Sequence, residues 1–178
     1  MVPGMGHLGM DDADSPVFPL GLGLEPEGVI ARGGSGWVVR ARDVRLNQRV
    51  AVKISRQDAG PQVRDVVLEE AQITALLQGP GVLAVHNVVD LETHVCVVFQ
   101  LAPEKTLADV DGMDRESTLT LLYGVLVPLI RAHEAGVFHG DLHPRNVAFG
   151  SITETYVLDW GGGSANEGEF AGHPGYAA

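Results

Sequence analysis

The stretch His139-Gly140-Asp141-Leu142-His143-Pro144-Arg145-Asn146, followed by Leu158-Asp159-Trp160-Gly161, decides the interpretation of this sequence. Asp141, Asn146 and Asp159 offer two carboxylates and one amide oxygen within a short span. Such hard oxygen donors suit Mg²⁺, which completes its shell with water and phosphate oxygens. One of the acids could also accept a proton from an attacking hydroxyl group. The two histidines leave a zinc site open, but no further ligands follow at a closed spacing. The pattern favours magnesium over zinc.

Two further candidates lie upstream, where residues 28–55 are predicted to form strands. In Gly33-Gly34-Ser35-Gly36 the glycines let the backbone approach a ligand and turn its N–H groups toward phosphate. A glycine-rich hairpin is nevertheless structural more often than not. In the run Val50-Ala51-Val52-Lys53, strand alternation places Ala51 and Lys53 on one face. A lysine on a half-buried strand needs an anionic partner, although a plain edge-strand lysine is the equal alternative.

A helix is predicted over residues 62–78 and should end at Gly79-Pro80. Glu70 falls near the centre of its apolar face, whereas Glu69 points away. A carboxylate in that position requires a buried cation, and Lys53 is the obvious partner. A poorly patterned surface helix is the alternative interpretation.

The order of the remaining elements indicates the fold class. Strands are predicted at residues 82–90 and 94–100, a helix at 115–134, and short strands at 147–149 and 156–158. The turn Leu46-Asn47-Gln48 predicts an antiparallel hairpin. The later helix carries an apolar stripe of Leu119, Leu122, Leu126, Leu129, Ile130 and His133. Pro128 within it is expected to cause a kink. Because strands and helices do not alternate regularly, the fold class is α+β.

Composition excludes several other classes. The 178 residues contain 12 Lys+Arg and 23 Asp+Glu, a net charge of −11 that argues against nucleic acid or anionic lipid as a partner. No segment reaches the about 18 apolar residues of a membrane span, and no signal peptide is recognised. The only cysteine, Cys96, excludes a disulfide scaffold and fits a reduced, cytoplasmic setting. Residues 1–24 are expected to form a flexible acidic tail, and the basic residues concentrate between Arg32 and Arg64.

Taken together, these residues resemble the signature of eukaryotic-type protein kinases, in the bacterial Ser/Thr form. A glycine-rich loop, a strand lysine, a helix glutamate, an HxDxxxxN loop and a DxG follow one another in the family's order. The resemblance implies an antiparallel β N-lobe with one helix, reaching through the hinge (residues 25–102), and a partial, mainly helical C-lobe (residues 103–178). Residues 172–178 look like the end of an activation segment, so the chain would stop before the Ala-Pro-Glu motif. The later helices would then be missing, and the apolar stripe on residues 115–134 would become an exposed patch.

The resemblance also implies roles for single residues. Asp141 would be the catalytic base, and Lys53 would hold phosphates of ATP while it pairs with Glu70. Asn146 and Asp159 would bind Mg²⁺. The positions implied to contact ATP are Gly33, Gly34, Ser35, Gly36, Val38, Ala51, Lys53, Phe99, Gln100, Ala102 and Ala148. The expected function is therefore ATP- and Mg²⁺-dependent phosphorylation of Ser or Thr in proteins.

Departures from the family pattern keep two alternatives open. Gly140 replaces an arginine that reads activation-loop phosphate, His143 stands where Ser/Thr kinases usually carry a lysine, and Trp160 replaces a phenylalanine. With the later helices missing, a nucleotide-binding pseudokinase or a regulatory fragment with a protein partner is one alternative. The run from His139 to Pro144 also resembles small-molecule kinases of the aminoglycoside and choline type, which is the other.

Overall fold

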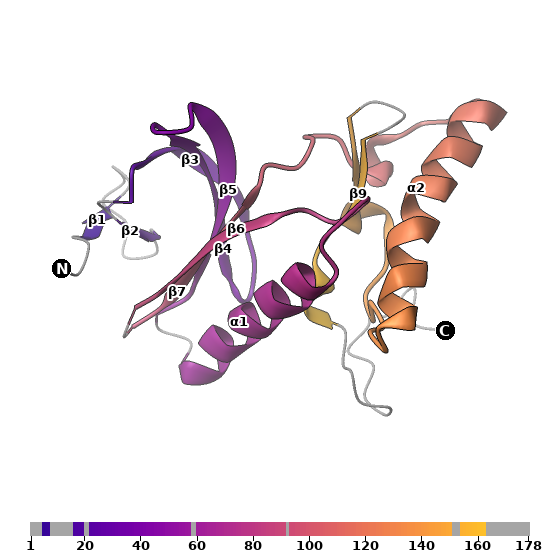
Figure 1. Ribbon diagram of the computed structural model, residues 1–178. Coiled ribbons are helices and arrows are strands. Elements are labelled where there is room, and N and C mark those ends of the chain that lie inside the picture. Colours follow the sequence, from indigo (N-terminus) through magenta and orange to yellow (C-terminus); the bar gives the residue numbers. More distant parts are fainter. Residues whose placement is uncertain are drawn as a thin grey trace. The chain divides into compact units, whose positions relative to one another are not determined.

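The computed structural model describes residues 5–7, 16–19, 22–57, 60–91, 93–150 and 154–162 (Figure 1). The chain divides into two compact units, Met1–Leu68 with Val85–Leu101, and Glu69–Ala84 with Ala102–Ala178. Strands and helices come in blocks, which confirms the α+β class. The residues expected to end an activation segment, 172–178, lie outside the described residues. The domain boundaries expected at residues 25 and 103 stay a prediction.

The first unit is built on a five-stranded antiparallel sheet with the strand order β3-β4-β5-β7-β6. Its strands are β3 (Leu24–Arg32), β4 (Gly36–Asp43), β5 (Gln48–Ser55), β6 (Val85–Asp90) and β7 (Val95–Gln100). The predicted hairpin is confirmed, because β4 and β5 pair across a turn in which Asn47 has a φ of 52°. Asparagine tolerates this left-handed conformation better than most residues. The strand predicted at residues 82–90 begins only at Val85.

One face of this sheet is almost completely buried. Its side chains form an apolar cluster that also contains Phe18 and is made of Val39, Ala41, Val50, Val52, Ile54, Cys96 and Val98. Phe18 is 1% exposed and belongs to β2 (Val17–Pro19), which pairs with β1 (Met5–His7). The expectation of a flexible tail therefore does not extend to Phe18, because burial of an aromatic ring offsets the entropy lost when a short segment is ordered.

Helix α1 (Pro61–Leu76) begins at a proline, a residue favoured in the first helical turn, and ends shortly before Gly79-Pro80 as predicted. Its second half belongs to the second unit. Three of the residues buried there are Glu70, Ala71 and Thr74, and the Thr74 hydroxyl donates to the backbone oxygen of Glu70 at 2.7 Å. Glu69 is exposed, as the helical pattern predicts.

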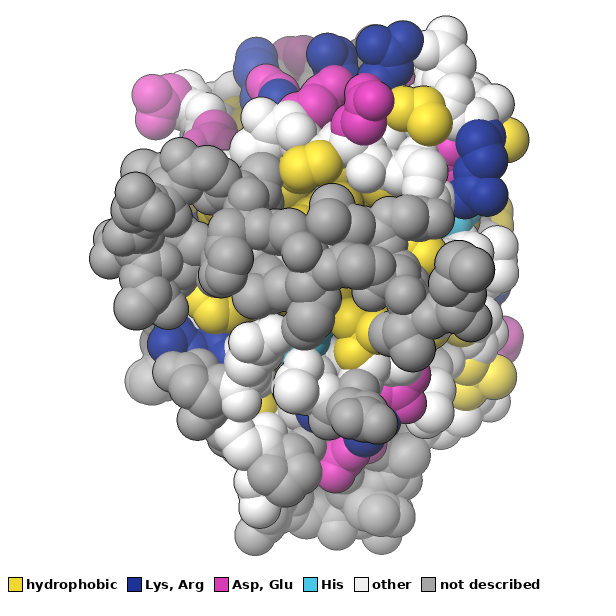
Figure 2. Space-filling model, turned by 90° about the vertical axis from the view of Figure 1, so that its left-hand side faces the viewer, with side chains coloured by type: hydrophobic (Ala, Val, Ile, Leu, Met, Phe, Trp, Pro, Cys, Tyr) yellow, Lys and Arg dark blue, Asp and Glu magenta, His cyan; other side chains and the backbone are white. Residues whose placement is uncertain are grey.

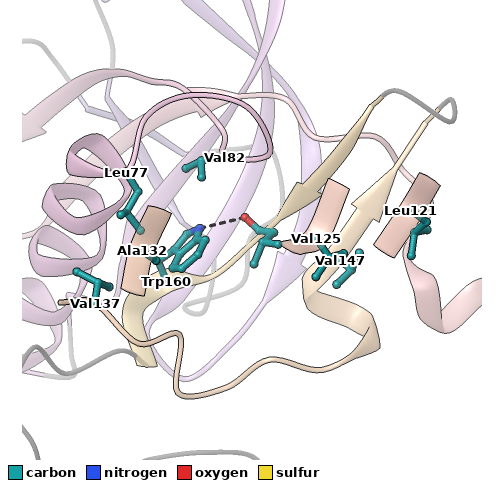
Figure 3. Close-up of a cluster of buried hydrophobic side chains, with 9 residues drawn as sticks. Leu77, Val82, Leu121, Val125, Ala132, Val137, Val147 and Trp160 are labelled. Atoms are coloured by element: carbon teal, nitrogen blue, oxygen red, sulfur yellow. Dashed lines mark hydrogen bonds between the residues drawn. The ribbon is translucent and has the colours of Figure 1, made fainter. Parts of the chain in front are cut away.

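Helix α2 (Arg115–Glu134) forms the main element of the second unit (Figure 1). Its first turn is capped by Asp114, whose carboxylate accepts the Ser117 N–H at 2.9 Å. The short elements that accompany it are η1 (Leu107–Asp109), η2 (Pro144–Asn146), β8 (Val147–Phe149), β9 (Thr155–Val157) and η3 (Trp160–Gly162). Figure 3 shows the core of this unit, which consists of Leu77, Val82, Leu121, Val125, Ala132, Val137, Val147, Val157 and Trp160.

The face that α2 buries is not the one that its leucines suggest. Leu119, Leu122, Leu126 and Ile130 are 47–57% exposed, so the expected apolar patch is present on the described residues. The buried residues of the helix are Leu121, Val125, Pro128 and Ala132. Glycines determine which face of the helix is buried. A Cβ on Gly124 would lie 2.7 Å from Thr155 Cβ, and a Cβ on Gly81 would lie 2.7 Å from Pro128 Cγ. The β8–β9 hairpin and the Gly81 turn therefore approach the helix backbone closely.

Arg131 of α2 ties this helix to the end of α1. Its guanidinium donates to the backbone oxygens of Leu77 at 2.8 Å and Gln78 at 2.7 Å. These carbonyls follow the last turn of α1 and have no partner within that helix. Within the described part of the chain, no helix is long and apolar enough to cross a membrane.

Candidate active site

The loop that follows α2 brings the three oxygen-donor residues of the sequence motif together. The Asn146 side-chain amide donates to the backbone oxygen of Asp141 at 3.0 Å. The backbone N–H of Leu158 donates to the backbone oxygen of Asn146 at 2.8 Å. Asp159 follows Leu158 directly, so both carboxylates and the amide lie in one cluster of loops within the second unit.

Asp159 is held in an uncommon backbone conformation. Its φ of 59° lies in the left-handed region, which aspartate, like asparagine, adopts more often than most other residues with a side chain. The next residue, Trp160, is 1% exposed and its indole N–H donates to the Val157 backbone oxygen at 3.1 Å (Figure 3). A buried ring thus anchors the turn that presents Asp159, and left-handed residues other than glycine cluster at functional sites.

His139 links this turn to the Asp141 loop. It is 3% exposed, and its ring centre lies 4.8 Å from that of Trp160. Its Nδ1 accepts the Asp141 backbone N–H at 3.3 Å, so the neutral ring carries its hydrogen on Nε2 and donates to the Leu158 backbone oxygen at 2.8 Å. Burial lowers the pKa of His139 below its ordinary value. The spacing of the motif offers His139 as a metal ligand, whereas the structure uses both of its nitrogens to join two loops.

Gly140 precedes Asp141 with a φ of 74°. In this left-handed region an arginine, which the family resemblance leads us to expect here, would cost roughly 1–2 kcal/mol. The backbone conformation of this loop therefore explains the glycine at position 140.

The register of the first unit's sheet gathers the predicted ATP-contacting side chains on one face. Lys53 on β5 is paired with Val38 on β4 and with Val97 on β7, and Ala51 is paired with Phe99. Cross-strand partners present their side chains on the same face. Val38, Ala51, Lys53 and Phe99 therefore share the face opposite the Phe18 cluster, as the predicted alternation requires.

The glycine-rich turn joins β3 to β4. The Gly33 N–H donates to the Gly36 backbone oxygen at 2.8 Å, and the Gly36 N–H donates to the Gly33 oxygen at 3.3 Å. Gly36 has a φ of 152°, and a Cβ there would lie 1.9 Å from the backbone oxygen of Ile54, so this glycine is required by the fold. A Cβ on Gly33 or Gly34 would meet nothing within 4 Å. The fold therefore requires a glycine at position 36, whereas the space over Gly33 and Gly34 is open to a ligand.

The remaining candidates are divided between the two units. Lys53 and Gln100 belong to the first unit, whereas Glu70, Ala102 and Ala148 belong to the second. The pairing of Lys53 with Glu70 therefore stays a prediction. Within its own unit, Glu70 is 7% exposed and lies against the turn after Asp159.

The basic segment between Arg32 and Arg64 is partly neutralised by acids within the first unit. Arg49 Nε lies 2.9 Å from a carboxylate oxygen of Glu27, and Arg64 Nε donates to Asp90 at 3.1 Å. On the face shown in Figure 2, Lys and Arg side chains stand among Asp and Glu side chains. A polar pocket of about 300 Å³ near the β4–β5 turn is lined by Glu27, Arg42, Asn47, Gln48 and Arg49. It lies at the opposite end of β4 from the glycine-rich turn.

The donor set of the second unit fits Mg²⁺ better than zinc. Within the described ranges, no group of three or more His, Cys, Asp and Glu side chains could hold a metal ion. Mg²⁺ is usually held by one or two carboxylates together with water and substrate phosphates. Asp159 could supply one carboxylate, and because the amide nitrogen of Asn146 donates to Asp141, its amide oxygen could supply a second ligand.

Comparison with known families agrees with this arrangement, since the model of the protein kinase domain matches residues 24–178. The chain belongs to the protein kinase family. A probable serine/threonine-protein kinase of Streptomyces coelicolor is 32% identical over 143 residues, which are 75% of this chain and 21% of that protein. The serine/threonine-protein kinase PknB of Mycobacterium leprae is 29% identical, over 75% of this chain and 23% of that protein. PknA of Mycobacterium tuberculosis is 30% identical, over 75% of this chain and 33% of that protein.

This kinase chain thus spans between about a fifth and a third of the length of these relatives. The matched segment contains every candidate residue from Gly33 to Asp159. It leaves out β1 and β2, and with them Phe18.

Proposed function

We propose that this kinase domain transfers the γ-phosphate of ATP to Ser or Thr hydroxyl groups of a protein, with Mg²⁺ as cofactor. The observation that supports this most is the hydrogen-bonded cluster of Asp141, Asn146 and Leu158, which keeps Asp141 and the two candidate magnesium ligands in one place. The substrate class is that of the serine/threonine-protein kinases to which the chain is similar. The single buried Cys96 fits a reduced, cytoplasmic setting.

In this function Asp141 is the base. Its carboxylate accepts the proton of the substrate hydroxyl while that oxygen bonds to the γ-phosphorus, and the bond from this phosphorus to the bridging oxygen of ADP breaks. In phosphoryl transfer the protein takes little part in covalent chemistry. Most of the rate enhancement comes from positioning the reactants and from stabilising the charge on the phosphate. The backbone of Asp141 accepts from Asn146 and donates to His139, and these two hydrogen bonds supply that positioning.

The other candidate residues bind and orient the nucleotide. Mg²⁺ held by Asn146 and Asp159 would neutralise phosphate charge when it is bound. Lys53 would hold the α- and β-phosphates and pair with Glu70. The unhindered backbone around Gly34 would let a phosphate approach closely, and the adenine would lie against Val38, Ala51, Phe99, Gln100, Ala102 and Ala148.

Transfer of labelled phosphate from ATP to the chain itself or to a generic acceptor such as casein tests the proposal. Asp141→Asn and Lys53→Met should each abolish the signal, and Glu70→Gln should weaken it strongly. Glu69→Gln, one position along the same helix and exposed, is the matched control and should change nothing. Transfer that survives both Asp141→Asn and Lys53→Met would overturn the assignment.

The same protein distinguishes the alternatives. An ATP-dependent rise in melting temperature without any transfer would identify a nucleotide-binding pseudokinase. ADP release driven by an aminoglycoside or by choline would identify a small-molecule kinase.

A further inference from the structure

The imidazole of His143 faces the carboxylate of Asp141. His143 Nε2 lies 3.7 Å from Asp141 Oδ2, and the two side chains are 15% and 29% exposed. On the other side of the ring, Nδ1 accepts the backbone N–H of Arg145 at 3.2 Å. A neutral imidazole has one N–H, so the hydrogen bond at Nδ1 places that hydrogen on Nε2. The ring therefore directs a donor at Asp141.

We infer that His143 is a positioning residue for Asp141, an inference that rests on the proposed function. The backbone of Asp141 is already held, since its oxygen accepts from Asn146 and its N–H donates to His139. These bonds fix the backbone of Asp141, whereas the contact with His143 acts on its carboxylate. A donor beside Oδ2 restricts the rotation of this carboxylate. The separation of 3.7 Å is longer than a hydrogen bond, and such contacts often tighten only when substrate binds.

The hydrogen-bonding groups of the imidazole differ from those of a lysine at the same position. A lysine side chain has three donors and no acceptor, so it could not accept the N–H of Arg145. The imidazole accepts at one edge and donates at the other. Replacement of His143 by lysine would therefore remove the bond that orients the side chain within its own loop.

Three variants test the inference through phosphotransfer kinetics. The amide nitrogen of His143→Gln can reach the place of Nε2, whereas that of the matched control His143→Asn falls short of it. His143→Asn should lower kcat by about ten-fold or more with the KM for ATP within about two-fold, and His143→Gln should restore most of kcat. His143→Lys should behave like His143→Asn. If lysine restores activity and glutamine does not, the side chain acts as a cation toward phosphate and the inference is overturned.

A second measurement does not depend on activity. Nitrogen-15 shifts of the His143 ring, assigned in the intact chain by comparison with His143→Gln, report which nitrogen carries the hydrogen. The Nε2–H form should predominate. An Nδ1–H form would overturn the inference about His143 and would leave the proposed function untouched. If the unaltered chain has the Nε2–H form and transfers no phosphate, the proposed function fails, and the catalytic meaning of the pair fails with it.

Discussion

Gly161 packs directly against Glu70: a Cβ on the glycine would lie 3.2 Å from both Cβ and Oε2 of the glutamate. Both residues belong to the second unit, and Glu70 is 7% exposed. The turn that presents Asp159 and helix α1 therefore meet at a point with no room for another side chain. The placement of Glu70 and that of Asp159 are linked by this contact.

Gly161→Ala should therefore disturb the site more than it disturbs the fold. The new methyl group must displace either the turn or the Glu70 side chain by a few tenths of an ångström, and overpacking of this kind costs about 1–3 kcal/mol. We expect phosphotransfer to fall by about ten-fold or more, because small displacements at a reacting centre are costly. Gly124→Ala presses on Thr155 in the same unit and controls for overpacking as such. Equal losses of activity in both variants would show that the contact with Glu70 has no special role.

Substitution of Gly36 in the glycine-rich turn should destabilise the fold, whereas substitution of Gly34 should not. Gly36→Ala would place a methyl group 1.9 Å from the Ile54 backbone oxygen at a φ of 152°. We expect it to lower the free energy of unfolding by about 3 kcal/mol in a urea titration followed by circular dichroism. Gly34→Ala, whose Cβ meets nothing within 4 Å, should stay within about 0.5 kcal/mol of the unaltered chain. Equal stabilities would contradict the assignment of Gly36 as a fold-determining residue.

Local pattern predicts part of this fold well. Strand alternation places Ala51 and Lys53 on one face, and the sheet register agrees. The helix predicted at residues 115–134 is observed with these bounds. Its buried face was not predictable from its leucines, because Gly124 and Pro128 let other segments approach its backbone.

Contacts between segments that are distant in the sequence cannot be predicted from local pattern. Phe18 lies in a stretch without periodicity, and only the apolar face of the sheet makes its burial favourable. The contacts of Gly161 with Glu70 and of His139 with Leu158 join segments that only the folded chain brings together. The order of the motifs therefore predicts the candidate site residues, whereas the contacts that support them require the structure.

Phe18 should protect Cys96 from thiol reagents. Both belong to the apolar cluster on one face of the first unit's sheet, and burial raises the pKa of the Cys96 thiol to about 12. Phe18→Ala should cost about 3–5 kcal/mol of stability and should accelerate the alkylation of Cys96, because the cluster opens more often. Cys96 is the only cysteine in the sequence, so the label reports this site alone. Leu46→Ala, at a side chain that is 67% exposed, is the control, and an equal alkylation rate in both variants would show that Phe18 does not cover the cluster.

Acid should weaken the second unit through His139. Burial lowers the pKa of this histidine below its ordinary value of 6.5, because the charged ring would lose solvation. Protonation would also put a hydrogen on Nδ1, where the backbone N–H of Asp141 already points. Well above pH 6.5 His139 is neutral in both the folded and the unfolded chain, so this residue adds little pH dependence there.

Below that value the unfolded chain binds the proton first, and the free energy of unfolding falls as the pH drops, by at most about 1.4 kcal/mol per pH unit, until the folded form protonates as well. Asp109 and Asp114, whose pKa values are lowered from 3.8 by hydrogen bonds from Thr106 and Ser117, titrate below this window. Urea titrations between pH 7.5 and pH 5 should therefore show the decrease in the unaltered chain and in His86→Gln, which changes an exposed histidine. The decrease should shrink in His139→Gln, which cannot be protonated. A slope that His139→Gln leaves unchanged would assign the acid sensitivity to other groups.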